Sequence, residues 1–394
     1  MATEKDRSPD ELKLKTEVGL LSGVSLIAGV MVGSGIFMSP QYVLLYIGSP
    51  GASLLIWAAS GLLAMLASLS YAELGTVIRE SGGEYIYILR TSGNIMAFIC
   101  AFTNNIVMRP TSMIAVALTF AQNTLAPFYD DCLPPNGAVK CLAALAIMVL
   151  TVLNCLNVRS SIRVTVLFMA MKVLALIIIV IGGVVLLIQG DTANSLQNSF
   201  DGTKLSIRPM GIAFYQCLWS YDGWNTLNHV TEEINHPEVN LPRALMIAVP
   251  MVTILYLLVN VSYLVVMTTT EMISSSAVAV TWGNKVLGGW GWVMSVAAAI
   301  SAFGSLNGSF FSGGRVCYVA AREGHMPDIL AMAHMHRRTP SPALIFNTII
   351  SLIVLIPGDF QAIVNFFRYS ARFCITPYYS YNQMIQPRNS SWYE

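Results

Sequence analysis

Long apolar runs, each close to the length of a membrane-crossing helix, dominate the pattern of hydrophobic and polar positions. A helix needs about 20 mainly apolar residues to cross the hydrocarbon core of a bilayer. Such runs occur at 18–46, 52–78, 94–124, 138–157, 165–189, 207–232, 243–269, 291–320 and 342–357, and a weaker candidate begins near 361. The pattern therefore predicts an all-α, polytopic membrane protein.

Composition agrees with this prediction. Of 394 residues, 55% are hydrophobic and only 11% are charged, whereas soluble domains carry roughly 25% charged residues. The net charge of +1 gives no support for nucleic-acid binding. The seven cysteines lack metal-ligand spacing, and the stretch HMHRRTP at 334–340 has no further ligands nearby. We expect no metal, no cofactor and no catalytic residue.

Lysine and arginine residues are distributed unevenly among the loops between the runs. If the N-terminus faces the cytoplasm, the outer loops carry Lys204, Arg208 and Lys285, with Lys140 at a boundary. The inner loops then hold Lys5, Arg7, Lys13, Lys15, Arg79, Arg90, Arg159, Arg163, Arg243, Arg322, Arg337 and Arg338. This is the positive-inside distribution, so we predict a cytoplasmic N-terminus.

The first run contains a cluster of small residues. It reads LLSGVSLIAGVMVGSGIFMSP, with Gly29, Gly33, Ser34 and Gly35 near its middle. Each glycine costs a helix interior roughly 1 kcal/mol relative to alanine. Gly29 and Gly33 alone also fit close packing between helices. The GSG triplet is harder to explain by packing, and it predicts that the helix unwinds there.

The sixth run is interrupted at the sequence YDGWN, residues 221–225, where Asp222 precedes Gly223. Broken helices at corresponding positions of two halves are typical of transporter binding sites. Spans one to five and six to ten would be the inverted halves. An unwound turn exposes N–H groups that attract a carboxylate and carbonyl groups that attract an ammonium. A free α-amino acid carries both.

Several motifs resemble one known family. GSGIF, AELGTVIRESGGEY, YDGWN with the following TEE, NVSY and AREGHMP are similar to the light chains of heteromeric amino-acid transporters, in the amino acid–polyamine–organocation superfamily. The likeness runs from about residue 17 to 367. The aspartate in YDGWN resembles the b-zero-plus type branch in particular.

The resemblance implies a 5+5 inverted-repeat fold and a function. That function is sodium-independent exchange of cationic and neutral L-amino acids, and of cystine, by alternating access. Arginine, lysine, ornithine and leucine would be substrates. The expected location is the plasma membrane, apical in epithelia. The resemblance also implies that Cys132, in an outward loop, forms a disulfide with a single-span heavy-chain glycoprotein; a free thiol is the alternative.

Together, the broken helices and the resemblance yield a set of expected substrate contacts. The N–H groups of Ser34, Gly35 and Ile36 would hold the carboxylate, and Asp222 would meet a cationic side chain. The remaining expected contacts are the carbonyl of Met31, that of Trp219 or Ser220, the Trp219 ring, Asn225 and, by resemblance, Thr111. Alternatively, Asp222 pairs with a resident cation or caps the half-helix near Asn225, Trp219 is a packing residue, and Asn225 steadies the unwound segment.

Other charged residues lie at membrane depth. By resemblance, the Lys172 ammonium would replace the sodium ion that related transporters hold between their first, fifth and eighth spans; a structural salt bridge is the alternative. Arg109, before Pro110, has no partner that the sequence identifies. Glu232 and Glu233 end the sixth span and suit either a gate or a loop anchor.

The resemblance divides the chain into a tail at 1–17, a transporter domain at 18–367 and a divergent tail at 368–394. That last segment, RYSARFCITPYYSYNQMIQPRNSSWYE, has no 20-residue apolar run. We therefore expect the last helices to be incomplete. An alternative function follows, in which this form binds the heavy chain without transporting.

Overall fold

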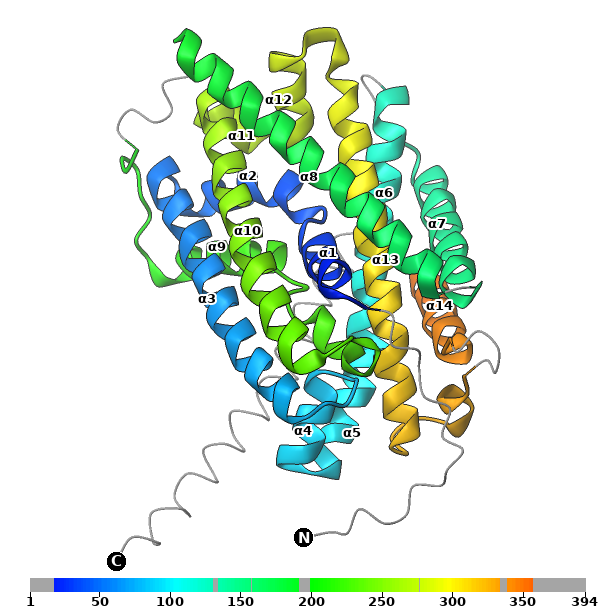
Figure 1. Cartoon of the computed structure of the whole chain (residues 1–394). Coiled ribbons are helices and arrows are strands. Elements are labelled where there is room, and N and C mark those ends of the chain that lie inside the picture. The colour runs from blue at the N-terminus through cyan, green and yellow to red at the C-terminus, as the bar shows by residue number, and fades with distance from the viewer. Residues whose placement is uncertain are drawn as a thin grey trace, which may run out of the picture.

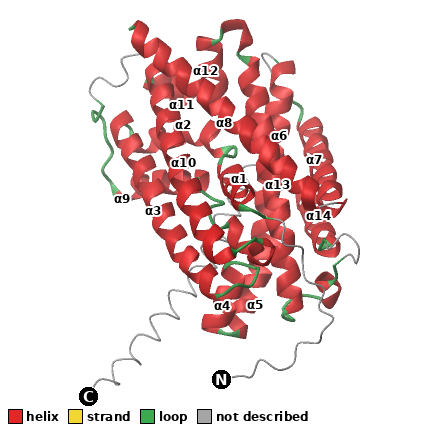
Figure 2. Ribbon diagram, viewed as in Figure 1, coloured by secondary structure: helices red, strands yellow, loops and turns green. Residues whose placement is uncertain are grey.

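The computed structural model describes residues 18–129, 134–156, 158–190, 199–275, 277–333 and 339–356. Over these ranges the chain is a bundle of helices, and the only β pairing is an isolated bridge between Val18 and Ile234 (Figures 1 and 2). Several predictions fall outside the described residues. They concern the tail at 1–17, Cys132, most of the His-rich stretch, the tenth candidate span and the tail at 368–394.

Five helices in the described part are long and apolar enough to cross a membrane, or six if the bent pair at the first run counts as one span. The five unbroken helices are α3 (Pro50–Val77), α7 (Asn136–Leu156), α8 (Val158–Gln189), α10 (Pro237–Val266) and α13 (Trp292–Arg322). A shorter apolar helix, α14 (Ser341–Leu355), matches the ninth predicted run. The prediction of an all-α polytopic protein is confirmed.

Three predicted spans appear in pieces. The first is α1 (Leu20–Met31) followed by α2 (Gly35–Ile47), which meet at an angle of 44°. The third is α5 (Asn94–Phe102), a π-helical turn at Thr103–Met108 and α6 (Arg109–Leu125). The sixth is α9 (Ile207–Ser220), a turn at 221–225 and a 3₁₀ helix at Thr226–Glu233.

Short helices mark the two ends of the bundle (Figure 1). Helix α4 (Glu84–Ser92) lies with α5 at one end, called the α4 end below. Helices α11 (Thr269–Ser274) and α12 (Val278–Val286) lie at the opposite end, the α12 end. Single 3₁₀ turns at Ala126–Phe128, Gly288–Trp290 and Asp328–Ala331 complete the described elements.

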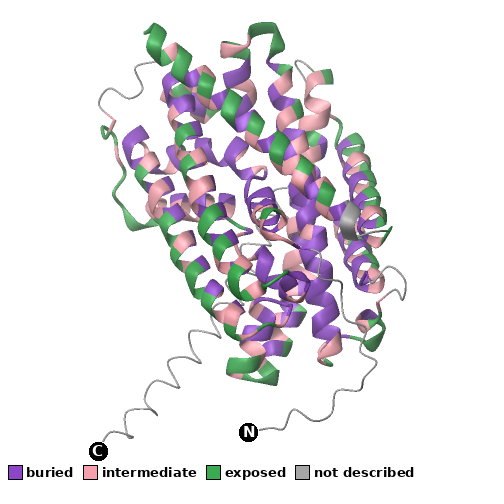
Figure 3. Ribbon diagram, viewed as in Figure 1, coloured by how far each residue is buried: buried purple, intermediate pink, exposed green. Residues whose placement is uncertain are grey.

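The broken first span runs through the middle of the bundle. Helix α1 packs against α8, α10 and α13, while α2 packs against α9. Helix α13 is buried along most of its length, whereas α3, α7 and α8 expose large apolar side chains such as Leu62, Val152 and Leu174 (Figure 3). An apolar exterior around a core that contains many buried polar groups is the arrangement expected inside a bilayer.

Candidate substrate site

The first helix breaks where the sequence predicts. Helix α1 ends at Met31, and α2 begins at Gly35. Between them the Gly33 N–H donates to the Met31 carbonyl (2.7 Å), and the Phe37 N–H donates to the Ser34 carbonyl (3.2 Å). Gly29 stays inside α1. The N–H groups of Gly35 and Ile36 precede the first bond of α2, so they are available to an anion.

The sixth span breaks at the predicted position as well. Gly223 has a φ of 107°, which favours glycine over every other residue. The chain continues as a 3₁₀ helix rather than an α-helix, with Val230 at φ −123° and ψ 25°. The carbonyl end of α9 and the turn that carries Asp222 therefore lie in irregular backbone at mid-span.

The two breaks touch each other. A Cβ atom at Gly35 would lie 2.7 Å from the Ser220 Cα, so the two backbones meet with no room for a side chain. At Gly223, a Cβ atom would lie 2.5 Å from the Val30 Cγ1. The glycines at 35 and 223 are thus needed for this close approach.

Two adjoining cavities open at the contact between the breaks. One has a volume of about 430 Å³ and the other of about 50 Å³, and the larger value falls in the range of small-molecule sites. The residues that line both are Val30, Ser112, Trp219, Asp222 and Ser309. Asp222 thus lies at the junction of a narrow space beside the breaks and a wider one beyond it.

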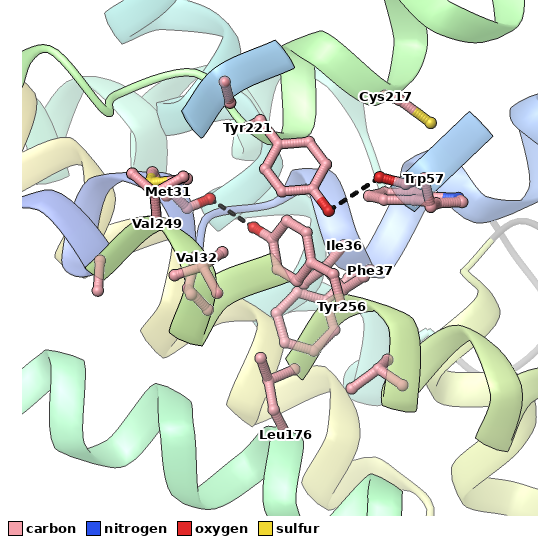
Figure 4. Close-up of a cluster of buried hydrophobic side chains, with 14 of the residues drawn as sticks. Met31, Val32, Ile36, Phe37, Trp57, Leu176, Cys217, Tyr221, Val249 and Tyr256 are labelled. Carbon is pink, nitrogen blue, oxygen red and sulfur yellow. Dashed lines mark hydrogen bonds between the residues drawn. The ribbon is translucent and has the colours of Figure 1, made fainter. Parts of the chain in front are cut away.

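Most of the expected substrate contacts gather here. The smaller cavity is lined by Met31, Ser34, Gly35, Trp219, Ser220 and Asp222, and Asn225 lines the larger one. The Ile36 side chain is instead buried among apolar neighbours (Figure 4). The expectation for Ile36 concerned only its N–H.

Thr111 is not brought to the site. Its hydroxyl donates to the Val107 carbonyl one turn earlier in its own helix (2.5 Å), and Ser112 lines the cavities in its place. The placement gives no support to Thr111 as a residue that borders the substrate.

Tyr256 on α10 joins the two breaks and was not identified from the sequence. Its hydroxyl lies 2.7 Å from the Met31 carbonyl oxygen and 3.1 Å from that of Ser220 (Figure 4). The rings of Trp57 and Tyr221 pack against it, with centroids 5.6 and 5.2 Å away. A tyrosine in an apolar run is a common packing residue, so the sequence held no signal for this role.

A charged cluster lines the larger cavity on the side of α4. Glu84 accepts from Asn225 Nδ2 (3.2 Å) and lies 2.9 Å from His229 Nε2. Arg109 lies 3.2 Å from His229 Nδ1 and donates to Ser312 Oγ (3.1 Å). These contacts supply the partners of Arg109. The charges of Glu84 and Asp222 both act on the Arg109 guanidinium.

Glu84 and His229 were missed as site residues. The available signal was weak, since Glu84 follows the glycine pair in ESGGEY and His229 sits in the polar stretch NHVTEE. Neither stretch shows which residue it will face. Among the described residues, no three His, Cys, Asp or Glu side chains gather as metal ligands would.

Lys172 lies between α1, α8 and α13. Its ammonium donates to the Gly29 carbonyl (2.5 Å) and to Ser305 Oγ (2.7 Å), and the side chain is 1% exposed. In the described part of the chain no carboxylate pairs with it. Lys172 therefore ties the last turns of α1 to α13 through neutral oxygen atoms.

Glu232 and Glu233 connect the end of the sixth span to neighbouring segments at the α4 end of the bundle. Glu233 forms a fully buried ion pair with Arg315 (2.7 Å), and Glu232 pairs with Arg322 (2.8 Å) and accepts from the Ser81 N–H (3.1 Å). Val18 also pairs with this segment through its backbone. These contacts fit an anchor across the α4 end better than a free gate.

Comparison with known proteins gives a consistent result. The profile of the amino acid permease family matches residues 18–376. The b(0,+)-type amino acid transporter 1 of Homo sapiens is 47% identical, over 93% of this chain and 75% of its own length. Its Mus musculus counterpart is 48% identical, over 93% and 76%. Large neutral amino acids transporter small subunit 2 of Homo sapiens is 40% identical, over 92% and 69%.

Proposed function

The chain belongs to the amino acid permease family, and we propose that this multi-pass amino acid transporter exchanges cationic and neutral L-amino acids, with cystine, across the plasma membrane. The proposed cycle is alternating access without sodium. No bond of the substrate is made or broken, so binding and movement are the whole of the mechanism.

The position of Asp222 is the observation that carries the proposal. It lines both cavities at the contact between the two breaks. The smaller cavity offers the N-terminus of α2 to a carboxylate and the carbonyls of Met31 and Ser220 to an ammonium. A substrate held there directs its side chain past Asp222 into the larger cavity. A cationic side chain gains a charge partner, whereas a neutral one fills the same space.

Other lining residues take supporting roles. The Trp219 ring lines both cavities and stacks on a guanidinium or walls off the substrate. Asn225 donates to Glu84, so it steadies the unwound turn against α4 rather than acting as a primary substrate contact. The N–H groups of Ser34, Gly35 and Ile36 form the carboxylate site.

Lys172 supports sodium independence. Its ammonium occupies the space between α1, α8 and α13 and already bonds the Gly29 carbonyl. A second cation there would be repelled and would find that oxygen atom taken. The Lys172 ammonium thus supplies permanently the positive charge that a bound sodium ion would supply only when present.

Assembly with a heavy chain is also part of the proposal. One relative is named a transporter small subunit. We place the N-terminus in the cytoplasm, which puts Cys132 on the outer face for a disulfide with a single-span glycoprotein. A non-reducing gel of cells that make both chains should show a joined band. That band should disappear in Cys132→Ser, and its persistence would contradict the assignment.

Counterflow in proteoliposomes tests the exchange. Vesicles loaded with leucine should take up radiolabelled arginine, and vesicles without internal amino acid should not. Uptake should be the same when choline replaces sodium. Dependence on sodium would contradict the role of Lys172, and equal uptake into empty vesicles would contradict exchange. Heavy-chain capture without any transport would favour the alternative function as a non-transporting partner.

A further inference from the structure

A further cavity opens at the α12 end of the bundle and shares no lining residue with the two cavities at the breaks. Its volume is about 960 Å³, which is at the upper end of the range for small-molecule sites. Helices α6, α8, α12 and α13 and the turns at Ala126–Phe128 and Gly288–Trp290 form its wall. We call it the α13 groove. Its lining includes Phe120, Phe168, Asn284, Ala299 and Phe303.

The groove exists because α8 leaves α13 on its way to the α12 end. At Gly304 of α13 a Cβ atom would lie 2.7 Å from the Phe168 Cβ and 2.9 Å from the Lys172 Cε, so the two helices touch there. Nearer the α12 end α8 packs on α12 instead, since a Cβ atom at Gly182 would lie 2.6 Å from the Trp282 ring. The divergence leaves a space between α6, α8 and α13.

The groove extends over one leaflet of the bilayer. Its lining on α13 runs from Trp292 to Phe303, a helical length of about 16 Å, and half of the hydrocarbon core is about 15 Å thick. The inner end lies at the depth of the break in α1, because Ser305 donates to the Gly29 carbonyl (3.0 Å). At the other end the exposed rings of Trp290 and Trp292 stack, as is typical of a membrane–water interface (Figure 1).

The wall of the groove is apolar and aromatic. The Phe303 ring centroid lies 5.2 Å from that of Phe120 and 5.4 Å from that of Phe168. None of the described residues that line the groove is charged, so the phosphate of a lipid headgroup would find no cation there. The uncharged polar side chains of Thr124 and Asn284 line it near the α12 end. The wall therefore suits an uncharged amphiphile with one polar group.

Small residues leave one side of the groove nearly flat. Gly288, Gly289, Gly291 and Ala299 line it, and a Cβ atom at Gly288 or Gly289 would meet no atom within 4 Å. A rigid ring system can pack on such a wall and loses little conformational freedom on binding, whereas a flexible acyl chain loses more. The shape thus favours a rigid occupant.

We propose that the α13 groove binds a membrane sterol, with its hydroxyl at the α12 end and its rings along α13. The Asn284 amide supplies both a donor and an acceptor to the hydroxyl. Thr124 already donates to the Phe120 carbonyl (2.8 Å), so its oxygen serves as an acceptor. The bound sterol fills the space between α6, α8 and α13 and stabilises the crossing at Phe168, one turn from Lys172. This inference goes beyond amino acid exchange and does not depend on it.

Photoaffinity labelling tests the proposal. The full chain, co-purified with the heavy chain, is placed in phosphatidylcholine vesicles with a cholesterol analogue that carries a diazirine on its ring system. Mass spectrometry should find the labels in residues 120–128 and 284–303. An excess of unlabelled cholesterol should reduce them by about fivefold or more, as competition for one site requires. A phosphatidylcholine with a diazirine on its acyl chain should show no such concentration of labels.

Two variants place an aromatic ring in the groove. Ala299→Phe fills it from the floor, and Val296→Phe fills it from a position that is 38% exposed and so more tolerant of a larger side chain. Each should lower the sterol labelling by about fivefold or more by excluding the ligand. The matched control is Leu62→Phe on α3, which is 60% exposed and lies outside the groove. It should label as the wild type does.

Thermal unfolding gives a second measurement. Cholesterol should raise the Tm of the wild type and of Leu62→Phe, because a ligand that binds only the folded protein stabilises it. It should raise the Tm of Ala299→Phe and of Val296→Phe far less. If Ala299→Phe does not fold, Val296→Phe carries the comparison.

The outcomes are distinct. Sterol labels scattered over the lipid-facing helices, or labels in the groove that persist in the folded groove variants, overturn the proposal. Labelling of the groove by the acyl-chain probe alone would make it a phospholipid site and overturn the sterol assignment. Absence of both labels there would show that another part of the assembly covers the groove. Because labelling needs no transport, failure of arginine and leucine exchange would overturn the proposed function and leave this inference standing.

Discussion

The hydroxyl of Tyr256 lies 2.7 Å from the carbonyl oxygen of Met31, the last residue of α1. The same hydroxyl is 3.1 Å from the carbonyl of Ser220, the last residue of α9. One phenol on α10 therefore faces the carbonyl ends of both broken helices. A hydroxyl has a single proton to donate, so it leaves acceptor capacity at these carbonyls for a substrate ammonium.

Tyr256→Phe should weaken both the fold and the substrate site. Loss of the shared donor leaves buried carbonyls less well satisfied, which costs about 1–3 kcal/mol of unfolding free energy. The carbonyl ends of α1 and α9 also lose the hydroxyl that both of them contact. We therefore expect the KM for leucine and the KM for arginine to rise together. Thermal unfolding and exchange kinetics measure the two effects.

Tyr221→Phe is the matched control for this prediction. It removes a hydroxyl that donates to the Trp57 carbonyl (3.2 Å) and not to the last carbonyls of α1 and α9. Its stability should fall by a similar amount with little change in KM. If the two variants had the same KM, Tyr256 would be only a packing residue.

The glycines of the first span should differ in their tolerance of alanine. A Cβ atom at Gly35 would meet the Ser220 Cα at 2.7 Å, whereas one at Gly29 would make an ordinary contact, 3.6 Å from Thr165 Cγ2. Gly35→Ala should force α2 away from α9, cost about 1–3 kcal/mol and abolish exchange. Gly29→Ala should leave exchange intact and gain up to about 1 kcal/mol from helix propensity.

Expression, unfolding and exchange of the two glycine variants check this pair. Equal tolerance of both would show that the close approach of the breaks is not required. Equal loss would instead favour the interpretation of Gly29 and Gly33 as one helix-packing motif.

The positions of the breaks could be predicted because their causes are local. Three glycines within seven residues, and a charge followed by glycine at membrane depth, are visible in a single stretch of sequence. The hydropathy pattern likewise located the spans, since the bilayer imposes a length on each. The contact between the breaks could not be derived this way, because residues 35 and 220 are far apart in the chain.

The expectation that Thr111 borders the site rested on resemblance alone, and Ser112 rather than Thr111 lines the two cavities. The π-helical turn at Thr103–Met108 widens the helix just before α6. A π-helical turn holds more residues than an α-helical one, so it changes which side chains before and after it share a face. Ser112 faces the site, and Thr111 bonds its own helix. The sequence offers no clear signal for such a turn.

The partners of Arg109 could not be predicted from the sequence, for a different reason. Glu84 follows the second predicted span, whereas His229 lies near the end of the sixth. Their convergence depends on the 3₁₀ geometry at Thr226–Glu233, which sets the direction of each side chain in that stretch. A regular α-helix, the simplest expectation there, would point His229 elsewhere.

The loop between α10 and α13 carries a titratable ion pair. Both Lys285–Glu271 distances are 2.8 Å, and Glu271 also accepts from the Thr268 N–H. These bonds, the one from Lys285 first, lower the pKa of Glu271 from 4.5 to about 2. Because the pKa is lower in the folded protein, the pair stabilises fully above about pH 4.5 and loses its effect as the pH falls towards 2.

Lys285→Met tests this pH dependence. The pair is exposed to solvent, so its contribution to the unfolding free energy should be about 1 kcal/mol or less. The difference between wild type and variant should be constant from about pH 7 to about pH 5 and should shrink below about pH 4. Thermal unfolding across that range measures it. A difference that grew at low pH would have the wrong sign for a carboxylate with a lowered pKa.

Asp222→Asn separates charge from shape at the junction of the two cavities. Asparagine keeps the size and shape of the side chain but removes its charge and replaces one acceptor oxygen by an amide donor. The backbone groups that hold the zwitterion are unchanged. Arginine exchange should fall about tenfold to a hundredfold, as expected for loss of a charged hydrogen bond, and leucine exchange should change far less. Asp201→Asn, which removes an exposed carboxylate, should alter neither. If Asp222 instead serves to cap the half-helix or to hold Arg109, both substrates will lose equally, and the selection of cationic substrates must then come from elsewhere in the cavity.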